Sequence, residues 1–187
     1  MNAGEVVSLQ RVKAWWAYTE IRSPRLMPEY QRDPRVPPLR AKIETAAFEH
    51  LSAFEVAALE EIFEIFRGDL LSHYLVDVRE FVIKEWSANQ LAQVYAMSEL
   101  DPLGEGRYRP FEIYAASQRP TGPHARLDPR VAADNVPMTT VLRTPDPLVI
   151  GIYKGFRVLI DGYFRGILFM RSASPGERVP LLVPIRR

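Results

Sequence analysis

The sequence predicts an α+β fold, in which a helical N-terminal region (residues 1–106) precedes a small mixed sheet with helices (residues 107–187). Up to about residue 100, apolar side chains recur at the spacing of one helix face. Beyond residue 107, short apolar runs alternate with turns that contain glycine or proline. With 187 residues, 47% of them hydrophobic, the chain can bury a sizeable core.

The clearest predicted helix begins after Ser52, which forms a capping box with Glu55. Gly68 is predicted to end this helix, because glycine is common just beyond a helix C-terminus. Helical spacing then resumes over residues 70–82. The apolar residues that define the first helix are Phe54, Ala58, Leu59, Ile62, Phe63 and Phe66.

Three other parts of this region have weaker patterns. A second capping box, Ser87 with Gln90, predicts a shorter helix. The aromatic-rich residues 12–18 fit either a helix or a strand. Residues 24–38 are rich in proline and arginine, so we expect an extended, irregular segment there.

The second region is predicted to begin with a short strand over residues 111–115 and a loop over residues 118–129. Asp128-Pro129 could start a short helix that continues through residue 133. The apolar runs 148–153 and 156–160 are predicted strands, joined by a Lys-Gly hairpin turn.

The C-terminal part continues the same strand and turn pattern. Asp161-Gly162 predicts a turn, residues 164–170 a helix, and residues 179–185 a final strand. Glycine between a strand and a helix permits backbone angles that other residues resist.

Charge is unevenly distributed, although the net charge is only +1. Residues 1–40 carry +3, residues 41–100 carry −7, residues 101–150 are neutral and residues 151–187 carry +5. The basic C-terminal part favours an anionic ligand such as phosphate, although a solvated surface has the same composition.

Composition excludes several classes of site. The chain has no cysteine, so disulfides, a thiolate nucleophile and cysteine-ligated metal are excluded. No apolar run is long enough to span a membrane, and no signal peptide is recognisable, so we expect a cytoplasmic protein. The three histidines are scattered and predict no zinc site.

The Asp161-Gly162 turn is the strongest candidate site. Backbone N–H groups at the start of the following helix lack partners and, with the helix dipole, favour an anion. Arg165 lies in the first helical turn, where its guanidinium can contact a phosphate. The alternatives are a helix cap for Asp161 and a surface ion pair for Arg165.

The sequence LIDGYFRGILFMRS, followed by PGERVPLLVPI, resembles the ParB/sulfiredoxin superfamily. Members have a strand that ends in a D/G-G-x-x-R turn, then a helix, then a closing strand. The resemblance covers residues from about 108 to 187 and includes the Gln118-Arg119-Pro120 loop. It implies a ParB/sulfiredoxin-like core that binds a nucleoside triphosphate such as ATP, and it implies ATPase or DNase activity.

Carried over to this chain, the resemblance implies that Arg119, Gly162, Tyr163, Phe164 and Arg165 bind the nucleotide. Hydrolysis needs charge neutralisation, a positioned water and usually a base or a metal.

Arg165 fits charge neutralisation, and Asp161 is the best-placed carboxylate for orienting water or binding a divalent metal such as Mg²⁺. Glu177 is a further catalytic candidate if its loop returns to the same edge of the sheet, although a solvated loop charge is the simpler interpretation.

Two departures from the superfamily limit the chemistry. Sulfinic-acid reduction is excluded, because it needs a thiol in the turn. Gly166 stands where partitioning proteins have a second arginine, which argues against a CTP switch.

Two biological roles remain open. The whole chain is similar to plasmid fertility-inhibition proteins, which implies an enzyme that acts on nucleotide or DNA and blocks conjugative transfer of plasmid or T-DNA. Alternatively, a non-catalytic module could dock a conjugation or secretion-system protein through its acidic helices. Residues 87–98 also resemble the start of a helix-turn-helix, but Pro102 and the acidic surroundings oppose that interpretation.

Overall fold

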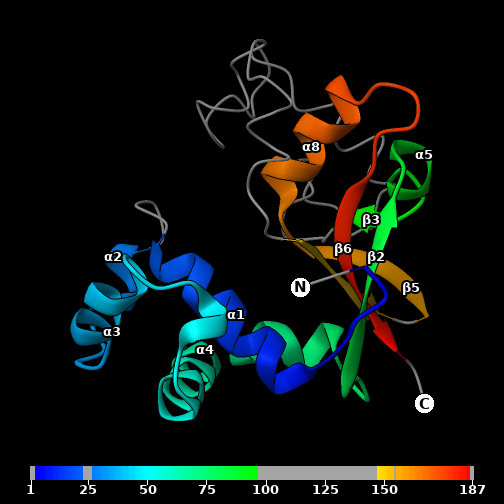
Figure 1. Ribbon diagram of the computed structural model, residues 1–187. Helices are drawn as coiled ribbons and strands as arrows, with labels where there is room; N and C mark the ends of the chain where they lie inside the picture. The colour runs from blue at the N-terminus through cyan, green and yellow to red at the C-terminus, as the bar shows by residue number, and fades with distance from the viewer. Residues whose placement is uncertain (1–2, 23–26, 97–146, 154, 186–187) are drawn as a thin grey trace. The chain divides into compact units, whose positions relative to one another are not determined.

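The structure is a computed structural model that describes residues 3–22, 27–96, 147–153 and 155–185. They form two compact units, a helical unit within residues 7–81 and a sheet unit that combines the chain start with residues from 82 to 185. Helices and a mixed sheet are both present, so the α+β class is confirmed (Figure 1).

The helical unit has its core where its first and last helices meet. Trp16 on the first helix and Phe63 on the last are almost fully buried, with ring centroids 5.1 Å apart. The ambiguous segment 12–18 is helical, because burying Val12, Trp15 and Trp16 together needs the i, i+3, i+4 spacing. The elements are α1 (Leu9–Arg22), α2 (Met27–Tyr30), α3 (Val36–Ile43), a 3-10 turn (Phe48–His50) and α4 (Ala53–Tyr74).

Helix α4 begins as predicted but ends later. The Ser52 hydroxyl accepts a hydrogen bond from the Glu55 N–H at 3.3 Å, and the Glu55 carboxylate accepts from the Ser52 N–H at 2.7 Å, so the capping box is confirmed. The helix does not stop at Gly68 but continues to Tyr74. A mid-helix glycine costs only about 1 kcal/mol, and the apolar face continues beyond it to the buried Tyr74 ring.

A turn and a strand follow α4, so the predicted helical continuation over residues 70–82 is wrong in its second half. The N–H of Val78 bonds to Leu75 O at 3.1 Å, and Asp77 adopts a positive φ of 63°. This turn stops the helix, and the β-branched and aromatic residues after it form strand β2 (Glu80–Trp86).

Ion pairs neutralise much of the acidic charge in the helical unit. Basic residues near the N-terminus pair with glutamates of α4: Lys13 with Glu64, Arg35 with Glu61 and Lys42 with Glu55. Residues 7–81 contain ten Lys/Arg and twelve Asp/Glu, a net charge of −2. The unit is therefore much less acidic than residues 41–100 alone suggest.

The sheet has the strand order β1-β2-β6-β4-β5-β3. Strands β4 and β5 form an antiparallel hairpin, while β4–β6 and β3–β5 are parallel pairs, so the sheet is mixed. The predicted hairpin and final strand are confirmed. The remaining bounds are β1 (Val6–Ser8), β3 (Tyr95–Ala96), β4 (Leu148–Tyr153), β5 (Phe156–Asp161) and β6 (Val179–Ile185).

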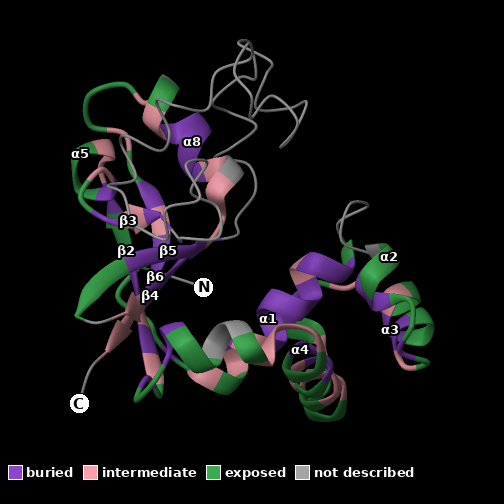
Figure 2. Ribbon diagram, turned by 180° about the vertical axis from the view of Figure 1, so that it is seen from behind, coloured by how far each residue is buried: buried purple, intermediate pink, exposed green. Residues whose placement is uncertain are grey.

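Helices α5 (Ala88–Leu91) and α8 (Tyr163–Ser172) contribute to the core of the sheet unit. Leu91 of α5 and Phe169 of α8 are fully buried in one cluster with Leu148, Leu159 and Leu181 of three strands. Figure 2 shows the buried side of α8 and the buried central strands. This packing fixes α8, and therefore the turn that precedes it.

The capping box of Ser87 with Gln90 is confirmed at α5. Four residues later, however, the chain forms β3, where Tyr95 pairs with Val158 of β5. A strand thus replaces the end of the helix that a helix-turn-helix would need, so that alternative is wrong.

Several predictions concern residues outside those described, namely the strand over 111–115, the loop over 118–129, the following helix and the boundary at 106/107. Helix α5, strand β3 and strand β2 from Val82 onward nevertheless belong to the sheet unit rather than to the helical one. Among the described helices, none has the length and apolar composition needed to cross a membrane.

Candidate functional site

The strand-to-helix turn is shaped by one glycine. Strand β5 ends at Asp161, and Gly162 forms the N-cap of α8 with φ 85° and ψ 22°. A Cβ atom at Gly162 would lie 2.4 Å from Cδ2 and 3.3 Å from Cα of Leu148, which is fully buried in β4. The position therefore requires glycine both for its left-handed backbone and for the close approach of β4.

The Arg165 guanidinium folds back over this turn. Its Nη2 atom lies 3.5 Å from the Asp161 carboxylate, and 3.2 Å from the point that a Cβ of Gly162 would occupy. The side chain is only 17% exposed, and its Nη1 atom is buried without a hydrogen-bond partner among the described residues. A buried guanidinium N–H without an acceptor is costly, so the turn has capacity for an anionic acceptor.

The backbone of the turn adds to this capacity. The first hydrogen bond of α8 runs from the Gly166 N–H to Gly162 O, at 2.8 Å. The N–H groups that precede Gly166 in the helix have no acceptor within it, and the helix dipole makes this end electropositive. Together with Arg165, this end can hold a phosphate group.

The other residues predicted at the nucleotide site differ in how far the structure describes them and in whether they can contact a phosphate. Tyr163 begins α8, but its hydroxyl donates to Leu159 O at 2.5 Å, so that hydrogen is not available to a phosphate. Phe164 lies in α8, where only its backbone is described. Arg119 lies outside the described residues.

Glu177 lies in the turn that precedes β6. In the sheet register, Val149 of β4 pairs with Asp161 of β5 on one side and with Leu182 of β6 on the other. Glu177 precedes Leu182 by five residues, which corresponds to about 15 Å along an extended chain. Its carboxylate accepts a hydrogen bond from the Ser174 N–H at 2.6 Å and closes the turn before β6. Because β4 is antiparallel to β5 and parallel to β6, β5 ends and β6 begins at the same edge of the sheet, as expected. Among the described residues, the Glu177 carboxylate contacts Ser174 rather than Asp161 or Arg165, so its catalytic role stays a prediction.

The turn does not form a metal site by itself. Among the described residues, no three histidine, aspartate or glutamate side chains gather closely enough to hold a metal ion. Asp161 supplies a carboxylate, but Arg165 is paired with it and competes with a cation. The described residues thus fit a phosphate better than they fit a protein-held Mg²⁺.

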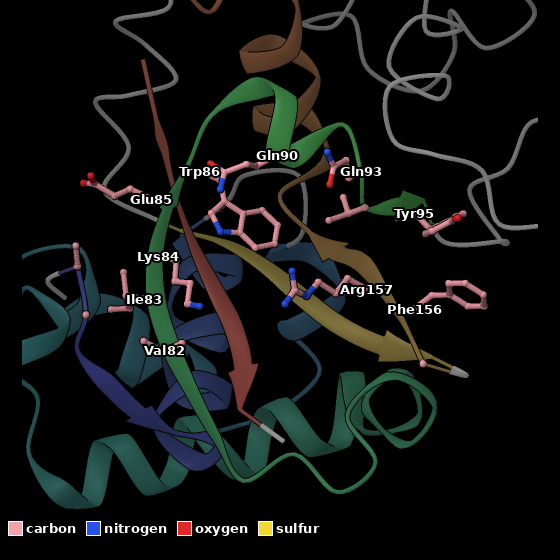
Figure 3. A pocket seen from close by; sticks show the side chains of 14 residues that line it. Val82, Ile83, Lys84, Glu85, Trp86, Gln90, Gln93, Tyr95, Phe156 and Arg157 are labelled. Carbon is pink, nitrogen blue, oxygen red and sulfur yellow. The ribbon is translucent and has the colours of Figure 1, made fainter. Parts of the chain in front are cut away.

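A second feature, which the sequence did not indicate, is a pocket of about 850 Å³ in the sheet unit. Its walls come from the chain start, β2, α5 with the residues after it, and the beginning of β5 (Figure 3). Strand spacing places Lys84 and Trp86 on one face of β2, but no sequence pattern shows that Arg157, some 70 residues later, faces them.

No family model, no curated protein and no solved structure matches this chain.

Proposed function

We propose that the Asp161–Arg165 turn binds the phosphate groups of a nucleoside triphosphate such as ATP, and that the protein hydrolyses phosphoanhydride or phosphodiester bonds. The observation that carries the proposal is the Arg165 guanidinium, held over the left-handed Gly162 with a buried N–H that lacks an acceptor among the described residues. A phosphate oxygen at this position satisfies that N–H and meets the electropositive end of α8.

Phosphate binding also changes the role of Asp161. In the structure its carboxylate is 3.5 Å from the Arg165 Nη2 atom. When a phosphate binds the Arg165 guanidinium, the Asp161 carboxylate loses part of its counter-charge. It can then orient a water molecule toward the phosphorus. The water oxygen forms the new P–O bond, the bond to the leaving phosphate or nucleotide breaks, and the proton of the water passes to the carboxylate or to solvent.

The experiment measures turnover of ATP and cleavage of plasmid DNA, each with and without Mg²⁺. Arg165→Ala and Asp161→Asn should each lower turnover at least a hundredfold, as is typical of removing a charge-stabilising or water-positioning group. Arg171→Ala is the matched control, because this exposed arginine lies in the last turn of the same helix. It should retain native activity.

The result that would refute the enzyme proposal is absence of turnover in the native protein. Full activity in both Arg165→Ala and Asp161→Asn, with circular dichroism unchanged, would also refute it. Dependence on Mg²⁺ would show that hydrolysis needs a divalent metal, whether Asp161 helps to bind it or it enters with the nucleotide.

The biological role proposed for this activity is inhibition of plasmid or T-DNA transfer. It rests on the similarity of chain length, helical extension and turn sequence to the plasmid-encoded oncogenic-suppression protein Osa. A mating assay tests it, since expression of the native protein in donor cells should lower transfer frequency and Arg165→Ala should restore it.

A second candidate function is a non-catalytic module that docks a conjugation or secretion-system protein. Three of the five acidic side chains of α4 are paired with cations, whereas Phe54 and Ile65 on this helix are 83% and 64% exposed. Eleven residues apart, they lie on one helix face. If docking is the function, changing both to serine restores transfer while Arg165→Ala does not, the reverse of the result expected for the enzyme.

A further inference from the structure

The pocket in the sheet unit combines aromatic rings with cationic groups. Trp86, at the end of β2, is almost fully buried in the core cluster. The Arg157 guanidinium carbon lies 5.5 Å from the centroid of the Trp86 ring, a cation–π contact. Because Arg157 as a whole is exposed, the guanidinium covers the ring and still faces the pocket.

A second cation faces the same space. Lys84 precedes Trp86 by two residues, so the two side chains share one face of β2. Figure 3 shows the Lys84 and Arg157 side chains directed toward the same part of the pocket, whereas Glu85 points away. Within the described part of the chain, neither Lys84 nor Arg157 pairs with a carboxylate.

The remaining walls suit a ligand that is partly aromatic. The rings of Tyr95 and Phe156 lie edge to face at the pocket margin, 5.2 Å apart, and Phe156 is 52% exposed. Gln93 is exposed at the wall, where its amide can donate and accept hydrogen bonds. Arginine planes and exposed rings stack on nucleobases, and unpaired cations bind phosphate.

We propose that this pocket binds a nucleotide unit, with the base stacked against the Arg157 guanidinium and its phosphate on Lys84. The unit belongs either to a free mononucleotide or to a single strand of DNA or RNA. This site is separate from the phosphate-binding turn, because Arg157 is the second residue of β5 and Asp161 the last, about 13 Å further along the strand. The inference does not depend on hydrolysis at the turn.

The test measures binding of a fluorescein-labelled oligo(dT) 12-mer by anisotropy, at fixed ionic strength. Competition with unlabelled dTMP and AMP follows. The series is run in the native chain and again in the Arg165→Ala background, so that the turn cannot supply the binding. Arg157→Met and Lys84→Met are the test variants. Arg178→Met is the control, because Arg178 is an exposed arginine of the sheet unit that does not line the pocket.

In both backgrounds, Arg157→Met should weaken binding about tenfold, as expected for loss of one stacking partner. Lys84→Met should weaken it at least threefold, and Arg178→Met less than twofold. Competition by dTMP or AMP in the micromolar range identifies a free nucleotide, and failure of both at millimolar concentration identifies a single strand. Absence of binding by the oligonucleotide, native affinity in both test variants, or an equal loss in the control overturns the proposal.

Discussion

The structure makes a quantitative prediction about Gly162. Alanine in the left-handed conformation costs about 1–2 kcal/mol. At φ 85° the new Cβ would also lie 2.4 Å from Leu148 Cδ2, and Leu148 is fully buried, so the core must shift to admit it. Overpacking of this kind costs about 1–3 kcal/mol. We therefore expect Gly162→Ala to lower the free energy of unfolding by about 2–5 kcal/mol, measured by urea denaturation followed by circular dichroism.

Gly176 provides a matched control for this prediction. It has a similar φ of 92°, but nothing lies within 4 Å of a Cβ placed there. Gly176→Ala should show the backbone cost alone, about 1–2 kcal/mol. Equal losses for the two variants would refute the claim that β4 closely packs the turn. A loss confined to Gly176→Ala would refute the geometry of the turn itself.

Two further predictions concern the helical unit. Lys42 holds the pKa of Glu55 down at about 2, so the stabilisation from Glu55 is complete above its ordinary pKa of 4.5 and lost as pH falls toward 2. The difference in unfolding free energy between native protein and Glu55→Gln should be constant above pH 5 and vanish near pH 2, and a difference that does not change with pH contradicts this. Arg67→Ala should lower the free energy of unfolding by about 3–5 kcal/mol, because it leaves the buried Glu20 carboxylate without its cation. Arg40→Ala breaks an exposed ion pair and should lower it by less than about 0.5 kcal/mol. Similar losses of unfolding free energy in Arg67→Ala and Arg40→Ala would contradict the burial of the ion pair between Arg67 and Glu20.

Local patterns predicted the elements that local forces determine. The two capping boxes, opened by Ser52 and Ser87, start helices where the sequence indicated, because the hydrogen bonds that define them span only three residues. The Asp161-Gly162 turn and the helix after it were also predicted, since glycine in a left-handed conformation has few alternatives at such a junction. The final strand over residues 179–185 has its predicted bounds.

Features that depend on distant contacts were missed or misread. The apolar spacing of residues 70–82 fits a helix, yet Phe81 lies buried on strand β2 of the sheet. Only contacts with distant parts of the chain decide whether this segment forms a helix or a strand. The pocket between β2 and β5 could not be predicted, because the contact of Trp86 with Arg157 joins residues 71 positions apart.

Acidic composition was also a poor guide to surface charge. Residues 41–100 carry a net −7, and this suggested an acidic docking surface. In the structure, glutamates of α4 pair with cations that lie earlier in the chain, among them Lys13 and Arg35. A net charge counted over a sequence segment therefore does not give the charge that a folded unit presents.

The measurement that tests the central claim most directly is equilibrium dialysis of isotope-labelled ATP against the native protein and the Arg165→Ala and Arg171→Ala variants. If the Asp161–Arg165 turn binds phosphate, the native protein and Arg171→Ala bind ATP with the same affinity. Loss of the charged hydrogen bonds from the Arg165 guanidinium then weakens binding by a factor of about 10–100. Identical ATP affinity in Arg165→Ala, or no binding by the native protein, would contradict the assignment of the turn as a nucleotide-phosphate site.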